Sequence, residues 1–328
     1  MALVTLSNTK QFTAAAEASL LDAAKAQGLV LEHSCRTGRC GACKALVVKG
    51  DTQVLRAEES LEASEVEAGF ILTCCRTATS DVELDIEDLG LLANIKMQTL
   101  PCKIDRVDLL APDVIQIFLR LPPTSQFNYL PGQYIDVIAK NGVRRSYSIA
   151  NSPRADNKLE LHIRAVTNGQ MSNYWFNDAK ANDLLRLEGP HGTFCYHPKE
   201  EKNLVFLATG TGIAPIKSIL DAFATSTEWV QEKKIYVYWG GRVPADIYWQ
   251  PNFTQLNIDF RPTLSRAANN WMGRRGYVQD AVIADGIDLE DSVIYACGSD
   301  TMIHAAKKLF VAQGLNPNSF YSDAFVSS

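Results

Sequence analysis

Residues 35–43 read Cys-Arg-Thr-Gly-Arg-Cys-Gly-Ala-Cys, and a further cysteine follows at residue 74. Three cysteines separated by four and then two residues, with a distant fourth, have the ligand spacing of a plant-type 2Fe-2S cluster. The glycines of this stretch let the backbone wrap around such a cluster and direct its N–H groups at the sulfur atoms. The spacing therefore predicts a cluster with ligands Cys35, Cys40 and Cys43 and a fourth ligand that is either Cys74 or Cys75.

The main alternative for these cysteines is a structural zinc site. Zinc sites typically use two pairs of cysteines, each pair separated by two to four residues, and the second pair is missing here. The sequence therefore favours an iron-sulfur protein over a zinc-stabilised nucleotide-binding scaffold.

The composition excludes several classes of protein. Hydrophobic residues make up 46% and charged residues 21% of the 328 residues, as in a globular protein of two or three domains. The net charge of -5 and the lack of a dense Lys/Arg stripe argue against binding to nucleic acid. No apolar run approaches the roughly 18 residues that span a bilayer, and the first residues do not resemble a signal peptide. We therefore expect a cytoplasmic protein without a membrane anchor, whose eight cysteines do not form a disulfide framework.

The pattern of predicted elements divides the chain into three domains. A hairpin, a helix over 19–28 with Ser19 as its N-cap, and strands over 44–50 and 82–86 predict a β-grasp ferredoxin domain over 1–90. A linker over 91–100 follows. Short strands separated by turn residues predict an antiparallel β-barrel over 101–199, with strands at 102–107, 114–121, 133–139, 145–149 and 159–166. Apolar strands at 204–208, 235–239 and 292–296, with a helix over 213–223, predict a parallel α/β domain over 200–328.

Two motifs in the barrel are compatible with a flavin. In the run Arg145-Ser146-Tyr147-Ser148, alternation directs Arg145 and Tyr147 to one face, where they can meet a phosphate and a ring. The run Gly169-Gln170-Met171-Ser172 opens a helical segment, and the N–H groups at a helix start can bind a pyrophosphate. Each motif alone is also common in ordinary surface structure. The turn over 188–194 is expected to close the barrel and is more typical of a structural element than of a ligand site.

Two strand-to-helix junctions in the last domain are compatible with a dinucleotide. Residues 209–215, Thr-Gly-Thr-Gly-Ile-Ala-Pro, join an apolar strand to a helix, and Pro215 suits the first helical turn. Residues 296–302 repeat this arrangement at the end of another strand, where ligands of open α/β sheets bind. Cys297 either lines the site of hydride transfer or is a small buried residue without chemistry.

The order of these motifs resembles the ferredoxin-NADP reductase superfamily, in the version with an N-terminal plant-type ferredoxin domain. The similarity spans essentially the whole chain, and the Leu-Thr-Cys context of residues 72–74 favours Cys74 as the fourth ligand. The resemblance implies that FAD is bound by Arg145, Ser146, Tyr147, Ser148, Gly169, Gln170, Met171 and Ser172. It implies that the nicotinamide dinucleotide is bound by Thr209, Gly210, Thr211, Gly212, Pro215, Cys297 and Gly298. It gives catalytic roles to Ser148, Cys297 and Phe325, of which Phe325 would shield the flavin ring.

Within this superfamily, the CDP-6-deoxy-Δ3,4-glucoseen reductases are resembled by residues 71–75, 101–103, 130–134, 168–172, 295–299 and 320–325. That resemblance implies NADH, with NADPH as the alternative, and Ser265-Arg266 is a possible site for the 2'-phosphate of NADPH. It also implies an electron-accepting partner protein, either a dehydrase of 3,6-dideoxyhexose synthesis or, as in related reductases, an oxygenase component. Arg36 and Arg39 beside the cluster loop are expected to form a local basic edge for docking.

Overall fold

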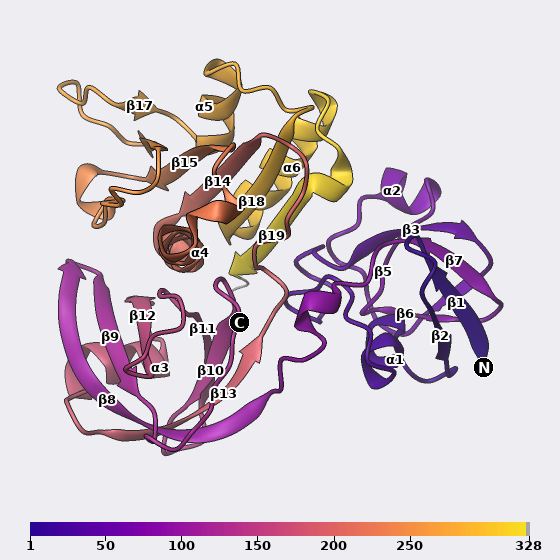
Figure 1. Cartoon of the computed structure of the whole chain (residues 1–328), viewed down its shortest axis with the longest axis horizontal. Coiled ribbons are helices and arrows are strands. Elements are labelled where there is room, and N and C mark those ends of the chain that lie inside the picture. Colours follow the sequence, from indigo (N-terminus) through magenta and orange to yellow (C-terminus); the bar gives the residue numbers. More distant parts are fainter. Residues whose placement is uncertain (326–328) are drawn as a thin grey trace. The chain divides into compact units, whose positions relative to one another are not determined.

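The computed structural model of the protein describes residues 1–325, which form two compact units, residues 1–96 and residues 97–325 (Figure 1). Residues 326–328, the end of the predicted third domain, lie outside the described residues. None of the helices formed by the described residues combines the length and apolar character needed to cross a membrane.

The first unit is built on a five-stranded sheet with the strand order β2-β1-β7-β3-β5. Its strands are β1 Ala2–Leu6, β2 Gln11–Ala14, β3 Lys44–Lys49, β5 Phe70–Leu72 and β7 Val82–Asp85, and a second small sheet pairs β4 Thr52–Val54 with β6 Arg76–Ala78. The helical elements are α1 Leu20–Ala26, α2 Ala63–Glu67 and η1 Gly90–Leu92. The predicted β-grasp architecture, with its last strand over 82–86, is confirmed.

Helix α1 begins and ends where the sequence predicts. The hydroxyl of Ser19 accepts a hydrogen bond from the backbone N–H of Asp22, which satisfies one of the free donors of the first turn. Gly28 follows the last turn with φ +79°, a conformation that favours glycine. The helix buries Leu20 and Leu21 in the core of this unit, and it leads directly into the cysteine-containing loop.

The second unit begins with a six-stranded antiparallel sheet in the order β11-β10-β13-β8-β9-β12, closed by a bridge between Ile149 and Leu161. Its strands are β8 Gln98–Ala111, β9 Val114–Arg120, β10 Tyr134–Ile138, β11 Arg144–Ser148, β12 Lys158–Arg164 and β13 Leu184–His191. The antiparallel barrel is confirmed, with two differences. Strand β8 begins inside the expected linker, and residues 188–191 of the expected turn belong to β13, where they pair with β8 and β10.

The rest of this unit is a parallel sheet in the order β17-β16-β15-β14-β18-β19, as predicted. The strands are β14 Asn203–Thr209, β15 Lys234–Gly241, β16 Ile258–Leu264, β17 Arg274–Arg275, β18 Ser292–Ser299 and β19 Phe320–Phe325, and the helices are α4 Ile213–Thr225, α5 Val278–Ala284 and α6 Asp300–Ala312. The strand order reverses between β14 and β18, and right-handed connections therefore put α4 and α6 on opposite faces of the sheet (Figure 1). The carboxyl ends of all strands meet at one edge.

Helix α4 attaches to the sheet through a regular apolar face. Ile216, Ile219, Leu220 and Phe223 are buried at spacings of three and four residues, which places them on one side of the helix. Burial of each such side chain contributes about 1.5–3 kcal/mol. This packing fixes the first turn of α4, and the loop before it, at the carboxyl end of β14.

Candidate functional site

The four predicted cluster ligands come together in the first unit. Cys40, Cys43 and Cys74 are buried and Cys35 is half-buried. The thiols lie in two neighbouring pairs, Cys35 beside Cys40 and Cys43 beside Cys74. The loop of residues 35–43 supplies Cys35, Cys40 and Cys43, and the turn after β5 supplies Cys74.

The backbone around these thiols is arranged for thiolates. The N–H of Thr37 donates to the sulfur of Cys35 at 3.4 Å, and the N–H of Cys35 donates to the sulfur of Cys40 at 3.4 Å. The hydrogen bond from Cys40 and those from the residue 37 and 39 N–H groups lower the pKa of the Cys35 thiol. The donor set therefore suits anionic sulfur ligands, and it fits a cluster held by these residues.

The spacing of the thiols also separates the two metal hypotheses. A tetrahedral zinc ion would bring all four sulfur atoms to distances below about 4 Å, because each Zn–S bond is about 2.3 Å long. Within residues 1–325, the four cysteines contain no set of three ligand atoms that all lie within 4.8 Å of one another. Two separate pairs are the arrangement expected for two irons that each take two thiolates.

Cys75 lies next to this group and is fully buried. Its sulfur is 3.5 Å from the sulfur of Cys74 and 3.5 Å from the carbonyl oxygen of Ala57. Because the Cys74 thiol lies beside Cys43 and the Cys75 thiol lies against the Ala57 carbonyl, the geometry favours Cys74 as the fourth ligand. The assignment stays a prediction.

The expected basic edge beside the cluster loop is of mixed charge. Arg36 forms an ion pair with Asp22, and Arg39 lies 3.4 Å from Glu59. Residues 1–96 hold nine Lys/Arg and fourteen Asp/Glu, a net charge of -5, so this unit carries the whole net charge of the chain. Docking at a local basic edge formed by Arg36 and Arg39 therefore stays a prediction, with the charge of each arginine partly offset by a carboxylate.

In the barrel, strand β11 carries the predicted flavin motif, and its side chains alternate as expected. Tyr147 lies opposite the buried Ile135 of β10 and accepts a hydrogen bond from the indole N–H of Trp175 at 2.9 Å. Burial raises the pKa of Tyr147 to about 12, so its hydroxyl stays protonated. Arg145 is exposed, and its guanidinium donates to the carbonyl of Arg144 at 2.8 Å. Its other donors are available to an anion.

Ser148 is the residue that indicates most directly whether this site suits a flavin. Its side chain is buried, and its hydroxyl has no hydrogen-bond partner within residues 1–325. A buried polar atom without a partner costs about 1–3 kcal/mol, which a bound polar ligand would recover. A flavin whose ring nitrogen reaches this hydroxyl therefore suits the site.

The second flavin motif opens a short helical segment, α3 Gln170–Asn173 followed by the π-helical turn η2 Tyr174–Asp178. Gly169 is the N-cap, and the hydroxyl of Ser172 accepts the N–H of Val166 at 2.7 Å. Gln170 and Met171 line a cavity of about 360 Å³ together with residues of the β10–β11 hairpin. The predicted pyrophosphate contacts stay predictions, and the Ser172 hydroxyl already has a structural partner.

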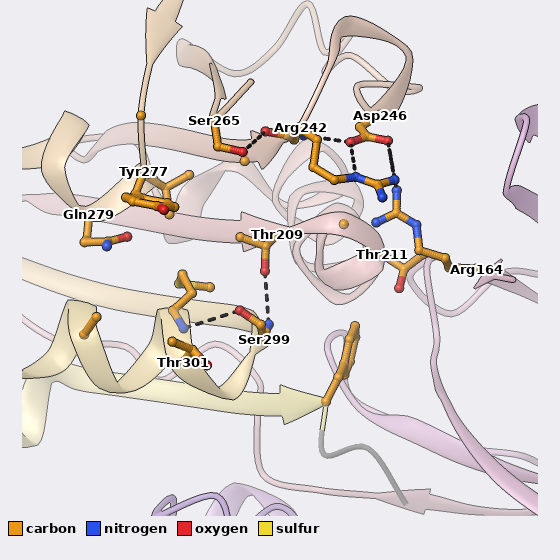
Figure 2. Close-up of a pocket in the computed structure, with 18 residues that line it drawn as sticks. Arg164, Thr209, Thr211, Arg242, Asp246, Ser265, Tyr277, Gln279, Ser299 and Thr301 are labelled. Carbon is orange, nitrogen blue, oxygen red and sulfur yellow. Dashed lines mark hydrogen bonds and ion pairs between the residues drawn. The ribbon is translucent and has the colours of Figure 1, made fainter. Parts of the chain in front are cut away.

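A cavity of about 760 Å³ lies at the carboxyl edge of the parallel sheet (Figure 2). Thr209, Gly210 and Thr211 line it from the end of β14, and Ser299 and Thr301 line it from the start of α6. The hydroxyl of Thr209 accepts the backbone N–H of Ser299 at 3.0 Å, which ties the two strand ends together. A cavity of this size and position is typical of a site for a nucleotide cofactor.

Two glycines of this site are required by the close approach of two strands. A Cβ on Gly212 would lie 2.2 Å from the carbonyl oxygen of Cys297. A Cβ on Gly298, which has φ +142°, would lie 2.1 Å from the Thr209 hydroxyl. Glycine at these two positions thus allows β14 and β18 to approach closely. From the sequence alone, both glycines were expected only to contact a ligand. Pro215 is buried in the first turn of α4, as expected.

Cys297 and Phe325, two residues with predicted catalytic roles, differ in their exposure. Cys297 is fully buried in the core, and it does not belong to the cavity lining. Its burial raises the pKa of the thiol. Phe325 lies at the end of β19, is partly exposed and does line the cavity. A contact of Cys297 with the nicotinamide and shielding of the flavin by Phe325 both stay predictions.

The sequence analysis missed a charged group at one end of the cavity (Figure 2). Arg164 of β12 lies 3.4 Å from Asp246, and Arg242 lies 3.1 Å from the same carboxylate. Burial would raise the pKa of Asp246, but its bonds to Arg242 lower it, so the group stays ionised. Arg242 directly follows Gly240 and Gly241, the glycines that end β15. Because ligands of parallel α/β sheets bind at the carboxyl ends of strands, this arginine was predictable from the sequence.

Tyr277 and Gln279, at the start of α5, also line the cavity and were missed. Tyr277 is 64% exposed, so the cavity wall offers an accessible aromatic ring. Ser265 lines the cavity as well, whereas Arg266 does not belong to the lining. The proposed 2'-phosphate site therefore has one of its two residues at the cavity.

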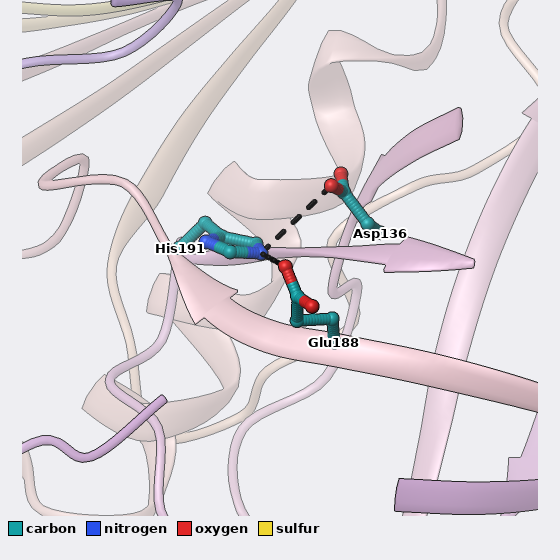
Figure 3. Close-up of side chains that lie close together, drawn as sticks. All are labelled: Asp136, Glu188 and His191. Atoms are coloured by element: carbon teal, nitrogen blue, oxygen red, sulfur yellow. Dashed lines mark ion pairs between the residues drawn. The ribbon is translucent and has the colours of Figure 1, made fainter. Parts of the chain in front are cut away.

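On the barrel, Asp136, Glu188 and His191 bring three potential metal ligands within 4.8 Å of one another (Figure 3). The guanidinium of Arg144 donates to Glu188 at 2.6 Å and to Asp136 at 3.3 Å. Because Arg144 already supplies the positive charge between the two carboxylates, the cluster is an ion-pair network.

A buried ionic network joins the barrel to the parallel sheet. Glu160 of β12 accepts hydrogen bonds from Gln116 at 2.6 Å and from Lys217 of α4 at 3.1 Å, and it contacts His162 at 2.9 Å. Lys217 also binds Asp221 at 3.0 Å. Burial alone would raise the pKa of Glu160, but His162 and Lys217 lower it to about 2. The network holds α4, and with it the loop of residues 210–212, against the barrel.

We expect Glu160→Gln to lower the free energy of unfolding by about 3 kcal/mol at pH 7, because Lys217 loses a buried partner. An ionised Glu160 stabilises the fold fully above its unfolded pKa, about 4.5, and this contribution is lost as the pH falls towards 2. Urea unfolding should therefore show that the difference in the free energy of unfolding between the variant and the unmodified protein becomes smaller as the pH falls from 7 to 3. The exposed Glu232→Gln is the matched control, and a pH-independent difference would contradict the expectation.

Comparison with known protein families identifies three domains in this chain. Residues 4–79 match the 2Fe-2S iron-sulfur cluster binding domain, residues 101–196 the oxidoreductase FAD-binding domain, and residues 206–308 the oxidoreductase NAD-binding domain. The predicted cofactor set of a 2Fe-2S cluster, FAD and a nicotinamide dinucleotide is thereby confirmed, and the chain is an oxidoreductase.

Individual proteins match over nearly the whole chain. The CDP-6-deoxy-L-threo-D-glycero-4-hexulose-3-dehydrase reductase of Yersinia pestis is 43% identical over 324 residues, covering 97% of this chain and 96% of that protein. Terephthalate 1,2-dioxygenase reductase component 1 of Comamonas sp is 30% identical over 325 residues, covering 97% and 95%. The solved structure of the Amycolatopsis cytochrome P450 reductase GcoB has a TM-score of 0.72 at 26% identity, covering 100% and 99%. This chain therefore belongs to the family of iron-sulfur flavoprotein reductases, within the ferredoxin-NADP reductase superfamily, that includes the Yersinia dehydrase reductase.

Proposed function

We propose that this chain is a CDP-6-deoxy-Δ3,4-glucoseen reductase, which passes electrons from NADH through FAD and the 2Fe-2S cluster to the dehydrase that forms CDP-3,6-dideoxyhexoses. One observation carries the choice of partner. Identity to the Yersinia dehydrase reductase is 43%, against 30% to the terephthalate dioxygenase reductase, although each alignment covers 97% of this chain. The higher identity at equal coverage supports the dehydrase as the partner.

The chemistry divides between the cofactors and the protein. When bound, the nicotinamide supplies two electrons as hydride, the flavin accepts the pair and releases electrons singly, and the cluster carries one electron at a time. The chain needs no general-base triad for this, because its residues bind and orient the three groups. Thr209 and Ser299 fix the edge of the nucleotide cavity, and the Ser148 hydroxyl offers one buried hydrogen bond to the flavin.

The test is reconstitution with purified partners. The reductase, at limiting concentration, is combined with NADH and either a CDP-hexulose 3-dehydrase with its substrate or an aromatic-ring dioxygenase with its substrate. We expect product with the dehydrase and little with the dioxygenase. Efficient turnover of the dioxygenase and none of the dehydrase would reverse the choice and favour the oxygenase reductase, the second candidate that the 30% relative supports.

The lining of the cavity supports a preference for NADH. Arg266 is exposed and outside the cavity lining, so we expect no productive bond to a 2'-phosphate and a higher kcat/KM for NADH than for NADPH. Arg266→Ala should change kcat/KM for NADH by less than about twofold, since surface changes away from a ligand have small effects. Steady-state reduction of ferricyanide with both nucleotides measures this. A higher kcat/KM for NADPH, lost in Arg266→Ala, would refute the preference.

We also propose that the protein acts in the cytoplasm and that the partner docks beside the cluster loop. Leu55 and Arg39 are exposed close to this loop, and the N–H of Leu55 donates to the carbonyl of Cys75. The exposed Leu55, hydrogen-bonded to the residue next to the predicted ligand Cys74, supports docking at this point. Arg39→Glu should weaken reduction of the partner and leave ferricyanide reduction unchanged.

A further inference from the structure

We propose that Cys75 tunes the reduction potential of the cluster by donating an S–H hydrogen bond to the sulfur of Cys74. Cys75 is fully buried, and its sulfur lies 3.5 Å from the sulfur of Cys74. The inference rests on the proposed electron-transfer function to the extent that the four thiols must hold the cluster.

The direction of this hydrogen bond follows from ligation. A thiol that binds a metal loses its proton, so Cys74 then has no proton to donate. Cys75 has no role as a ligand in the favoured assignment and keeps its S–H group. Of the two adjacent sulfur atoms, only Cys75 can therefore be the donor.

Cys75 has a second acceptor within reach, the carbonyl oxygen of Ala57 at 3.5 Å. One proton cannot serve two acceptors fully, and a hydrogen bond to an ionised acceptor is stronger than one to a neutral carbonyl. The ligand sulfur of Cys74 therefore competes well for this proton. It competes better still when the cluster has gained an electron, because the negative charge on its ligands is then larger.

The surrounding backbone holds Cys75 in this position. A Cβ on Gly38 would lie 2.9 Å from the sulfur of Cys75 and 2.3 Å from the carbonyl oxygen of Ala57. Glycine at position 38 leaves the space that the Cys75 thiol occupies, and the N–H of Leu55 fixes the Cys75 carbonyl at 2.7 Å. The donor is thus pre-positioned against one ligand of the cluster.

Hydrogen bonds to cluster sulfurs stabilise the reduced state and raise the reduction potential. Removing this donor should make the potential more negative. We expect Cys75→Ala and the near-isosteric Cys75→Val to retain iron and to lower the affinity of the cluster for its electron about tenfold, equivalent to about 59 mV for a one-electron couple. Cys75→Ser keeps a hydroxyl donor, so its cluster should have a reduction potential closer to that of the unmodified protein.

The measurement is a spectroscopic redox titration of the cluster in the purified full chain, without any partner protein. Cys102→Ala, a buried cysteine in the barrel core, is the control and should leave the potential unchanged. The inference is overturned if Cys75→Ala and Cys75→Val both keep the reduction potential of the unmodified protein. It is also overturned if the potential of Cys75→Ser shifts as far as the potentials of these two variants. A wild-type protein without cluster absorption would instead refute the proposed function.

Discussion

Cys74→Ser is expected to give a protein with far less iron than the roughly two atoms per chain of a 2Fe-2S cluster, and with lost or altered visible absorption. Thiolate ligation contributes heavily to cluster assembly, and Cys74 is the thiol paired with Cys43. Cys75→Ser is the matched control, because it changes the adjacent residue on the same turn. It should retain most of the iron.

Iron and sulfide analysis of both variants, purified in parallel, checks this expectation. The opposite result, with iron lost from Cys75→Ser and kept in Cys74→Ser, would assign the fourth ligand to Cys75. It would also remove the basis for Cys75 as a hydrogen-bond donor. Loss of iron from both variants would point to a general sensitivity of this turn.

Gly212→Ala should have the second large effect, on the nucleotide site. The new Cβ would meet the carbonyl oxygen of Cys297 at 2.2 Å and its carbonyl carbon at 2.6 Å, both backbone atoms of β18. These atoms cannot move without disturbing the pairing of β14 with β18. We expect a loss of more than about 3 kcal/mol in the free energy of unfolding, or a fall of about tenfold or more in NADH-driven flavin reduction.

Thermal unfolding and stopped-flow reduction of the flavin by NADH measure the two consequences. Gly90→Ala is the control, since its nearest neighbours would be ordinary contacts at 3.5 Å and beyond. If Gly212→Ala behaves as this control does, the close approach of the two strands does not limit the site.

The parts of this molecule that depend on local sequence were predictable. Ser19 and Gly28 delimit α1 through bonds and backbone angles within a few residues, and the cysteine spacing of residues 35–43 places its thiols around one loop. The strands of the parallel sheet were found because continuous apolar runs are typical of strands buried on both faces.

The errors arose where tertiary pairing overrides local signals. Strand β13 contains Gly189 and Pro190, which usually indicate a turn, yet Gly189 pairs with Gln98 of β8 and Pro190 falls at the bulge in the pairing with β10. The charged end of the nucleotide cavity was missed because Arg164 and Asp246 are 82 residues apart and meet only when the barrel contacts the sheet. The hydroxyl of Ser148 was predicted, but its lack of a partner is visible only in three dimensions.

The loop between β16 and β17 is stabilised at its far end by Trp271 and by Arg275 of β17. The guanidinium of Arg275 donates to the carbonyls of Ala267, Ala268, Asn269 and Trp271, and the indole N–H of Trp271 donates to the carbonyl of Arg274. Ser265 and Arg266 begin this loop and donate their backbone N–H groups to the carbonyls of Gly241 and Arg242 at 3.0 and 2.9 Å. The glycine contacts between β14 and β18 lie on other strands. Substitutions beyond Arg266 in this loop can therefore accumulate, in evolution or by engineering, without disturbing the close approach of those two strands.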